Sequence, residues 1–275
     1  MQKRFVKYEK NRLMTQLPIL NYHGIEARER EYPWLHPEKP YVISRTSFEK
    51  QLDFLLEHGF KTLTLCELED WFEGSVTYEK PVIVTFDDAH ISQYEHVVDL
   101  FERKNLKAVF FVPVGLIGQP GHMTWDQLKN LVVKGFEVGS HGVKHIPLSN
   151  LTHHELWKEL DQSKKALEKE LGIHVTSFSV PRGFYQLRIR EVAMELGYKF
   201  LFTSRFDVNY AGQDPWRLNR IAVKRNLSLK DFNRFVQGDL GYKRIVEQAK
   251  EGLRRVVHPS IYDALADFKR VLYHG

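Results

Sequence analysis

Four polar residues follow strand-like runs at spacings that could hold a metal ion. Asp87 and Asp88 come directly after 82–86, a run of β-branched and aromatic residues typical of a buried strand. His141 follows a second such run, and His145 lies four residues further on. Two adjacent carboxylates at the end of a core strand are costly unless a positive group is bound there.

Two histidines and a carboxylate form a ligand set that catalytic zinc sites use. An HxxxH pair alone is often a chance arrangement, and Gly142 and Pro147 indicate a loop or a helix start at this point. With Asp88 added, however, His141 and His145 would give three protein ligands and leave one coordination position for water. The joint pattern therefore predicts a catalytic metal centre.

A repeating β-α unit would position these groups. From residue 44 onward, short apolar runs alternate with amphipathic stretches, which is the pattern of strands joined by helices. Capping pairs predict three helix starts, at Thr46 with Glu49, Thr124 with Gln127, and Thr152 with Glu155. Strand-like runs lie at 17–22, 61–65, 82–86, 108–112, 136–139, 177–180, 199–203 and 218–223. Helical crossovers make such strands mostly parallel, and functional groups collect at their C-terminal ends.

Length and composition allow one large α/β domain. The 275 residues are 43% hydrophobic and 27% charged, which excludes disorder, collagen and coiled coil as overall descriptions. The single cysteine, Cys66, excludes an internal disulfide, and no signal peptide or membrane span is visible, so we expect a cytoplasmic protein. No linker or repeat divides the chain. We expect a lead-in over 1–16, a barrel over 17–225 and a helical extension over 226–275.

The net charge of +5 originates in the C-terminal part of the chain. Residues 224–275 hold eleven Lys and Arg against six Asp and Glu. We expect no nucleic-acid partner, because a charge of this size fits a solvated helix face. Basic residues interleaved with Leu253, Phe268 and Leu272 would also suit weak docking at an anionic membrane surface. We expect these helices to pack on the barrel as a cap, with membrane docking as the alternative.

Four sequence runs resemble the motifs of a known enzyme family in order and spacing. They are VTFDDAH (84–90), GSHGVKH (139–145), SFSVPRGFY (177–185) and DPWRLNRI (214–221). They resemble the polysaccharide deacetylases, carbohydrate esterase family 4, also called the NodB-homology domain. The opening LPILNYHGI resembles the Tyr-His start of a subset of that family.

This resemblance implies a fold, a cofactor and a reaction. The fold would be a distorted (β/α)7-8 barrel, here with a helical C-terminal extension. The cofactor would be a divalent metal, usually zinc, with cobalt, nickel and manganese as alternatives. The reaction would be hydrolysis of an N-acetyl or related acyl group on an amino sugar in a carbohydrate or glycoconjugate.

The resemblance also implies roles for individual residues. Asp87 would be the catalytic base, while Asp88, His141 and His145 would bind the metal. Such a metal lowers the pKa of its bound water toward ~7 and polarises the acyl carbonyl, while the neighbouring carboxylate removes the proton of the water. In the loop 179–183, backbone N–H groups would face the developing oxyanion, which makes Pro181, Arg182 and Gly183 candidate substrate contacts.

The sequence departs from the family pattern where the base is normally oriented. Most members have an arginine at the start of the third motif and a tyrosine after its proline, whereas this chain has Ser179 and Arg182. We therefore expect Arg220 to orient Asp87 in place of that arginine. The alternative is that Arg220 makes only a structural ion pair. Ala89 also stands where a glycine usually follows the aspartate pair.

The histidine that usually acts as general acid is not visible after Val223. A closed barrel places its first and last strands side by side, so we expect His23 to protonate the leaving amine or to contact substrate. The alternative is that Tyr22 and His23 only close the barrel. Tyr22 and Trp216 are candidate substrate contacts, with a core position as the alternative for Trp216. The remaining histidines, His90 included, are given no role.

Two other functions compete with a deacetylase of finished polysaccharides. A barrel that binds carbohydrate but catalyses weakly would explain Ala89, the altered third motif and the missing late histidine. A deacylase of a lipid-linked or nucleotide-linked sugar precursor would explain the lack of an export signal. Retention of the base and all three ligand types favours an enzyme.

Overall fold

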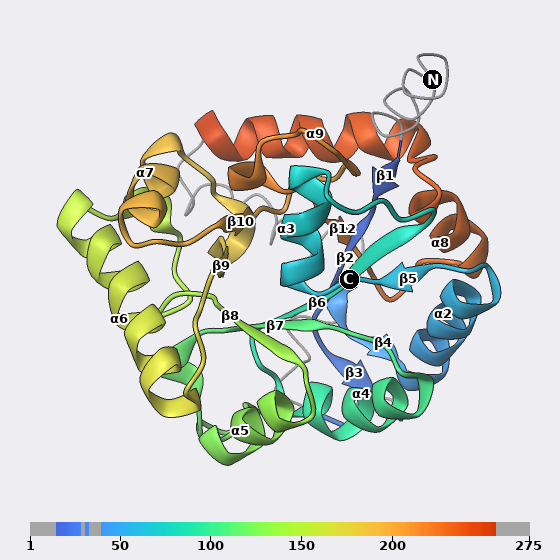
Figure 1. Cartoon of the computed structure of the whole chain (residues 1–275), viewed down its shortest axis with the longest axis horizontal. Coiled ribbons are helices and arrows are strands. Elements are labelled where there is room, and N and C mark those ends of the chain that lie inside the picture. Colours follow the sequence, from blue (N-terminus) through green and yellow to red (C-terminus); the bar gives the residue numbers. More distant parts are fainter. Residues whose placement is uncertain (1–14, 29–30, 33–39, 257–275) are drawn as a thin grey trace, which may run out of the picture.

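A ring of parallel strands forms the centre of the fold (Figure 1). The computed structural model describes residues 15–28, 31–32 and 40–256. The strands pair in the order β10-β9-β8-β7-β6-β2-β12, with β5 alongside β6. Their bounds are β2 (Ile19–Tyr22), β5 (Lys61–Thr62), β6 (Pro81–Asp87), β7 (Val109–Val112), β8 (Glu137–Ser140), β9 (Ser177–Ser179), β10 (Phe200–Phe202) and β12 (Ile221–Ala222).

Backbone contacts on both sides of the last strand close this ring. On one side, Phe202 of β10 forms a parallel bridge with Leu218, and Thr203 N donates to Leu218 O at 2.9 Å. On the other side, Ile221 of β12 pairs with Leu20 of β2. The predicted β/α barrel is thus confirmed, and its first and last strands lie side by side.

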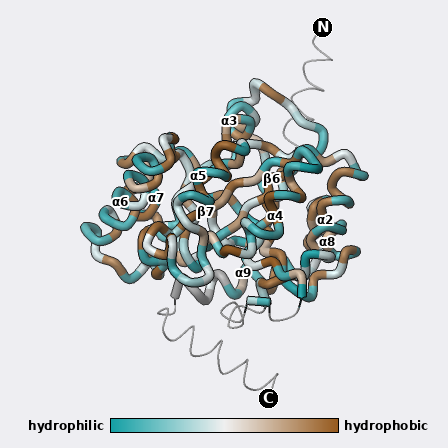
Figure 2. Tube along the Cα trace, turned by 90° about the horizontal axis from the view of Figure 1, so that it is seen from below, coloured by the Kyte–Doolittle hydropathy of each residue, from teal (hydrophilic) through white to brown (hydrophobic). Residues whose placement is uncertain are grey.

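Helices pack around the outside of the ring (Figure 1). They are α2 (Arg45–Glu57), α4 (Ile91–Lys104), α5 (Trp125–Val133), α6 (His153–Leu171), α7 (Leu187–Glu195), α8 (Leu229–Val236) and α9 (Gly241–Val256), while α3 (Leu65–Glu73) covers one end. Short elements complete the fold: β1 (Gln16–Leu17), β3 (Ile25–Glu26), β4 (Ile43–Ser44), β11 (Asn209–Tyr210), η2 (Val114–Leu116), η3 (Leu148–Asn150), η4 (Pro181–Gly183) and η5 (Pro215–Arg217). Brown and teal alternate along helices such as α2 and α4 in Figure 2, as expected for amphipathic helices.

Helix capping follows the sequence at two of the three predicted starts. Capping boxes at Thr124 and Thr152 begin α5 and α6. The start predicted at Thr46 is wrong, because the Ser44 side chain accepts from Ser47 N and α2 begins earlier. The division into a lead-in, a barrel and an extension stays a prediction, since 1–14 and 257–275 lie outside the described residues.

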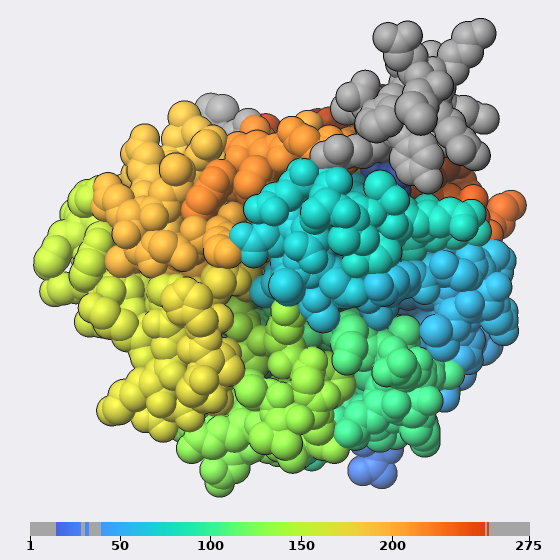
Figure 3. Space-filling model, viewed as in Figure 1, coloured from blue at the N-terminus to red at the C-terminus, as the bar shows by residue number. Residues whose placement is uncertain are grey.

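Alternate residues of each strand face two different cores. Val82, Val84 and Phe86 of β6 belong to the larger core beneath the helices, whereas Ile83 belongs to a smaller core inside the ring. Apolar side chains of α3 close the inner core, and this helix, cyan in Figures 1 and 3, lies across the face seen there. Asp87, the last residue of β6, lies toward the opposite end of the barrel.

A buried glutamate joins α3 to the start of a strand. Glu137 is the first residue of β8, and its Oε2 accepts a hydrogen bond from Leu65 N at 2.7 Å. Burial raises the pKa of Glu137 to about 7. The folded protein therefore holds a proton on this carboxyl at pH values at which the unfolded chain has lost it.

Stability should decrease with rising pH because of Glu137. A carboxyl whose pKa is raised in the folded state favours folding fully only below its unfolded pKa, and the contribution is lost as pH rises to about 7. Glu137→Gln keeps an acceptor for Leu65 N without this dependence. We expect its stability gain over wild type to grow by about 2 kcal/mol between pH 5 and pH 8 in urea unfolding. Equal gains at both pH values would contradict the raised pKa.

Candidate metal centre and active site

A left-handed turn at the end of β6 brings two carboxylates to one site. Neighbouring side chains of a strand point to opposite faces, but β6 ends at Asp87, and Asp88 and Ala89 have φ angles of 77° and 53°. This conformation costs a residue with a Cβ atom about 1 kcal/mol and a glycine almost nothing. The glycine-to-alanine departure at Ala89 therefore retains the turn at an energetic cost.

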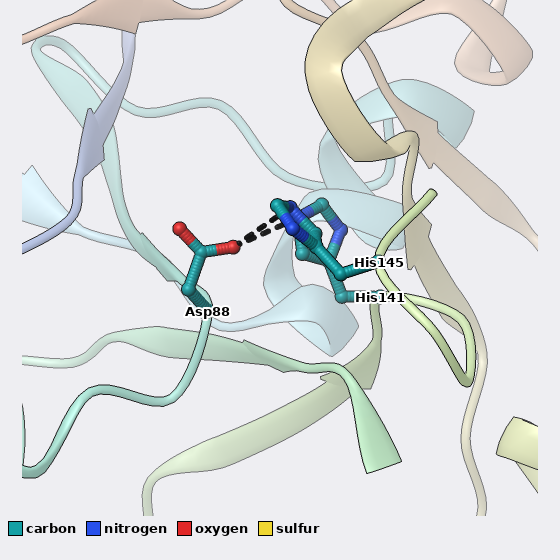
Figure 4. Close-up of side chains that lie close together, drawn as sticks. All are labelled: Asp88, His141 and His145. Carbon is teal, nitrogen blue, oxygen red and sulfur yellow. Dashed lines mark ion pairs between the residues drawn. The ribbon is translucent and has the colours of Figure 1, made fainter. Parts of the chain in front are cut away.

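Asp88, His141 and His145 converge on one point (Figure 4). Asp88 Oδ1 lies 3.0 Å from His145 Nε2 and 3.4 Å from His141 Nε2. Asp88 is buried, and its Oδ1 accepts no hydrogen bond from any residue that the structure describes. Burial alone would raise the pKa of Asp88, but His145 and His141 hold it well below its usual value.

Hydrogen bonds to Ser179 and to Glu159 of α6 hold the loop that carries the two histidines. His141 Nδ1 lies 2.7 Å from Ser179 O, so this nitrogen donates and Nε2 is left with a lone pair that could bind a cation beside Asp88. Glu159 of α6 accepts from Val143 N at 2.7 Å and from Lys144 N at 3.1 Å. A buried, orphaned carboxylate oxygen facing two imidazole nitrogens fits a divalent cation.

Asp87 is held by a buried arginine and two polar side chains. Arg220 Nη1 donates to Asp87 Oδ1 and Nη2 to Oδ2, both at 2.8 Å. Ser179 Oγ at 3.3 Å and Asn21 Nδ2 at 3.2 Å also donate to Oδ2. Arg220 Nε in turn donates to Thr203 O at 2.9 Å, which fixes the guanidinium plane. The sequence-predicted partnership of Arg220 and Asp87 is therefore present.

This pairing keeps Asp87 charged despite its burial. Burial alone would raise the pKa of Asp87, but the Arg220 guanidinium, with a smaller effect of His141, holds it below its usual value. The His141 Nε2 and Asp87 Oδ2 atoms are 3.9 Å apart. Asp87 is thus an ionised acceptor beside the candidate metal ligands.

Asn21 and Tyr22 are neighbours on β2, so their side chains face opposite sides of the sheet. Tyr22 was the candidate substrate contact from the sequence. Asn21 faces the inside of the ring with Asp87, whereas Tyr22 faces the outer core, where its hydroxyl donates to Gln51 Oε1 at 2.9 Å. Tyr22 is 1% exposed, so the expectation that it contacts substrate is wrong. The alternation of side chains along β2 was the signal that would have selected Asn21.

The second oxygen of Asp88 faces two further imidazoles. His23 Nε2 lies 3.9 Å and His90 Nε2 lies 3.8 Å from Asp88 Oδ2. The ring of His23 is 5.0 Å from that of Tyr41, and His90 stacks on His122 at 5.1 Å. His23 lies here because Tyr22, the residue before it, pairs with Phe86 of β6. His90, which was given no role from the sequence, lies two residues after Asp88.

The third motif lies beside the site, but part of its backbone is already engaged. Val180 N donates to Phe202 O, and Gly183 N donates to Val180 O. These two N–H groups therefore do not face the site as expected, and Pro181 has none. Arg182 is exposed with a φ angle of 57°.

Trp216 lies in η5, where it is half-buried. Its described packing is against the larger apolar core. This position matches the core alternative that the sequence left open for Trp216.

Comparisons with known proteins agree with this geometry. Residues 74–201 match the family model for polysaccharide deacetylase. One relative is YxkH of Bacillus subtilis (strain 168), whose name describes it as a polysaccharide deacetylase. It is 26% identical over 224 residues, which cover 81% of this chain and 77% of YxkH. The poly-beta-1,6-N-acetyl-D-glucosamine N-deacetylase of Staphylococcus aureus (strain MSSA476) is 23% identical over 238 residues, which cover 79% and 81%.

A solved structure shows the same fold. The Streptococcus pyogenes deacetylase PplD in complex with acetate matches with a TM-score of 0.73 and 25% sequence identity, over 82% of this chain and 98% of PplD. The fold is therefore the NodB-type barrel that the sequence motifs predicted. Together, the family match over 74–201, these relatives and the barrel show that this chain is similar to polysaccharide deacetylases.

Proposed function

We propose that the protein is a metal-dependent N-deacetylase of a carbohydrate that contains an amino sugar. The observation that carries this proposal is the convergence of Asp88, His141 and His145 beside an ionised, arginine-clamped Asp87. The Staphylococcus aureus relative is named for removal of N-acetyl groups from a glucosamine polymer, which supports an N-acetylglucosamine polymer or oligomer as substrate.

Asp88, His141 and His145 would hold the metal. Bound there, a divalent cation would lower the pKa of a coordinated water to about 7 and polarise the acyl oxygen. Zinc suits two imidazoles and one carboxylate in a site with an open position. Cobalt, nickel and manganese remain alternatives to zinc.

Asp87 accepts the proton of the attacking water. Its low pKa keeps it ionised at neutral pH, and its two hydrogen bonds with Arg220 fix the direction of both oxygens. Arg220 acts as a positioning residue, because it contacts Asp87 from the side of the barrel interior. The bond between the acyl carbon and the amine nitrogen then breaks, and the acyl group leaves as a carboxylate.

His23 donates a proton to the leaving amine. It faces the oxygen of Asp88 opposite to the one that faces His141 and His145. Acid and base therefore act from different sides of the ligand cluster, as protonation of the nitrogen and deprotonation of the water require. Arg182 and its neighbours in the third motif remain candidate substrate contacts.

The competing functions are less well supported. A carbohydrate-binding barrel that catalyses weakly does not need both the arginine clamp on Asp87 and a buried ligand set. A lipid-linked or nucleotide-linked sugar precursor would use the same chemistry, so that alternative concerns the substrate alone. Acetate release from N-acetylglucosamine oligomers, compared with release from such precursors, separates these substrates.

Location and membrane contact stay predictions. In the ranges that the structure describes, none of the helices has the length and apolar character of a membrane span. α9 exposes Tyr242 and Ile245 at 75% and 72%, beside basic side chains. This surface supports weak contact with an anionic membrane, while cytoplasmic location rests on the sequence alone.

Metal content tests the ligand assignment. Wild-type protein purified without chelators should hold about one divalent ion per chain, measured by mass spectrometry. His141→Ala combined with His145→Ala should lose it, because Asp88 alone cannot retain the ion. His153→Ala combined with His154→Ala, two histidines at the start of α6, is the matched control. Absence of metal from wild type after reconstitution with zinc, cobalt and manganese would contradict the proposal.

Asp87→Asn should abolish acetate release while metal content stays near one per chain. The amide keeps the size of the carboxylate but cannot take a proton from water, so kcat should fall at least about a hundredfold. Release of acetate is measured on an N-acetylglucosamine oligomer, and thermal unfolding shows that the variant is folded. Turnover equal to that of wild type would show that Asp87 is not the base.

Arg220→Lys tests positioning against a simple ion pair. Lysine keeps the positive charge but cannot make two parallel hydrogen bonds to one carboxylate. We expect kcat to fall about ten- to a hundredfold with little change in KM, because the ligand cluster is unaltered. If kcat is retained, Arg220 only neutralises charge.

A further inference from the structure

Gln93, a buried amide in the first turn of α4, joins the backbones of two residues of the proposed site. Its Nε2 donates to His23 O at 3.0 Å and to Asp87 O at 2.6 Å. Gln93 is 0% exposed. Two carbonyl acceptors require the NH2 group at this place, so the orientation of the amide is fixed.

These two bonds lie just where the strand pairing stops. The register of β2 with β6 runs as far as Tyr22 with Phe86. The next residues, His23 and Asp87, carry the proposed acid and base, and beyond Asp87 the chain turns away with a positive φ at Asp88. The Gln93 amide therefore connects the two strand ends after the described pairing ends.

The first turn of α4 holds the His23 segment at a second point. Ser92 Oγ accepts from Ile25 N at 3.2 Å, while Gln93 donates to His23 O. The segment between these bonds is the connection from β2 to β3. Its backbone is thus fixed at both ends. This fixes the position of the His23 Cα atom, from which the imidazole extends.

The cost of this arrangement indicates more than a packing role. Gln93 Oε1 is buried and has no hydrogen-bond partner among the residues that the structure describes. A buried unpaired carbonyl is unfavourable, and an apolar side chain of the same length would avoid it. Such a side chain would, however, lose the two hydrogen bonds that the Gln93 amide donates to the strand ends.

We propose that Gln93 is a positioning residue that sets the place of His23 relative to Asp87 and Asp88, and so serves protonation of the leaving amine. This inference rests on the proposed function. It differs from the role of Arg220, because Gln93 acts on the backbone that carries the acid and does not touch the side chain of the base.

The test compares two substrates that differ in their need for an acid. An N-acetylglucosamine oligomer has an amine leaving group that must be protonated, whereas 4-nitrophenyl acetate has a leaving group that departs as an anion. For Gln93→Met we expect kcat on the oligomer to fall about ten- to a hundredfold, and kcat on the ester to change by less than about threefold. Metal content should remain near one per chain.

Further variants separate positioning from loss of structure. His23→Gln should show the same selective loss, and adding Gln93→Met to it should cause little further loss, because both changes disable one step. Gln51→Met is the matched control, since it removes a buried glutamine bond to Tyr22 and should show no selectivity between the substrates. If Gln93→Met does not fold, Gln93→Asn, with a shorter amide, should show a smaller loss of the same kind.

A structural readout accompanies the kinetics. In a crystal structure of Gln93→Met, the separation of His23 Nε2 and Asp88 Oδ2 should depart from 3.9 Å. Equal losses on both substrates, or an unmoved His23 with wild-type kcat, would overturn the role of Gln93. Lack of acetate release by wild type, or a non-selective loss in His23→Gln, would instead overturn the function on which it rests.

Discussion

Two adjacent buried carboxylates set the main physical constraint on this protein. Asp87 and Asp88 would repel each other and lose hydration inside the fold, so each needs its own positive partner. For Asp87 this partner is Arg220, which is 1% exposed and donates to the carboxylate through both Nη atoms. For Asp88 it would be the proposed cation, which His141 and His145 would hold together with Asp88. Different partners give neighbouring carboxylates different chemistry.

The barrel supplies the geometry that this division needs. Asp87 faces the inside of the ring because it shares strand parity with Ile83, and the left-handed turn that follows β6 brings Asp88 to the same end of the barrel. Ala89 retains that turn at an energetic cost. Helices act from outside: Glu159 of α6 fixes the histidine loop, and Gln93 of α4 joins the ends of β2 and β6. The inner core below the site is apolar and closed by α3.

Much of this could be predicted from the sequence, because strand ends and closure follow from local patterns. The order of strands and helices placed the ligand residues together. Pairing of β2 with β6 brings His23 to the aspartates, and closure by β12 brings Arg220 there. The alternation of side chains along β2 makes Asn21 face the site, whereas Tyr22, the candidate from the sequence, faces the outer core. His90 and the engaged N–H groups of the third motif depend on loop conformations, which no spacing rule specifies.

The central claim is that one ion at Asp88, His141 and His145 makes the barrel a deacetylase. The most direct measurement removes metal from the protein, restores zinc in steps, and follows acetate release from an N-acetylglucosamine oligomer. We expect no release without metal and a linear rise that ends at one equivalent per chain. Undiminished release by the metal-free protein, or no release at any zinc level, would contradict it.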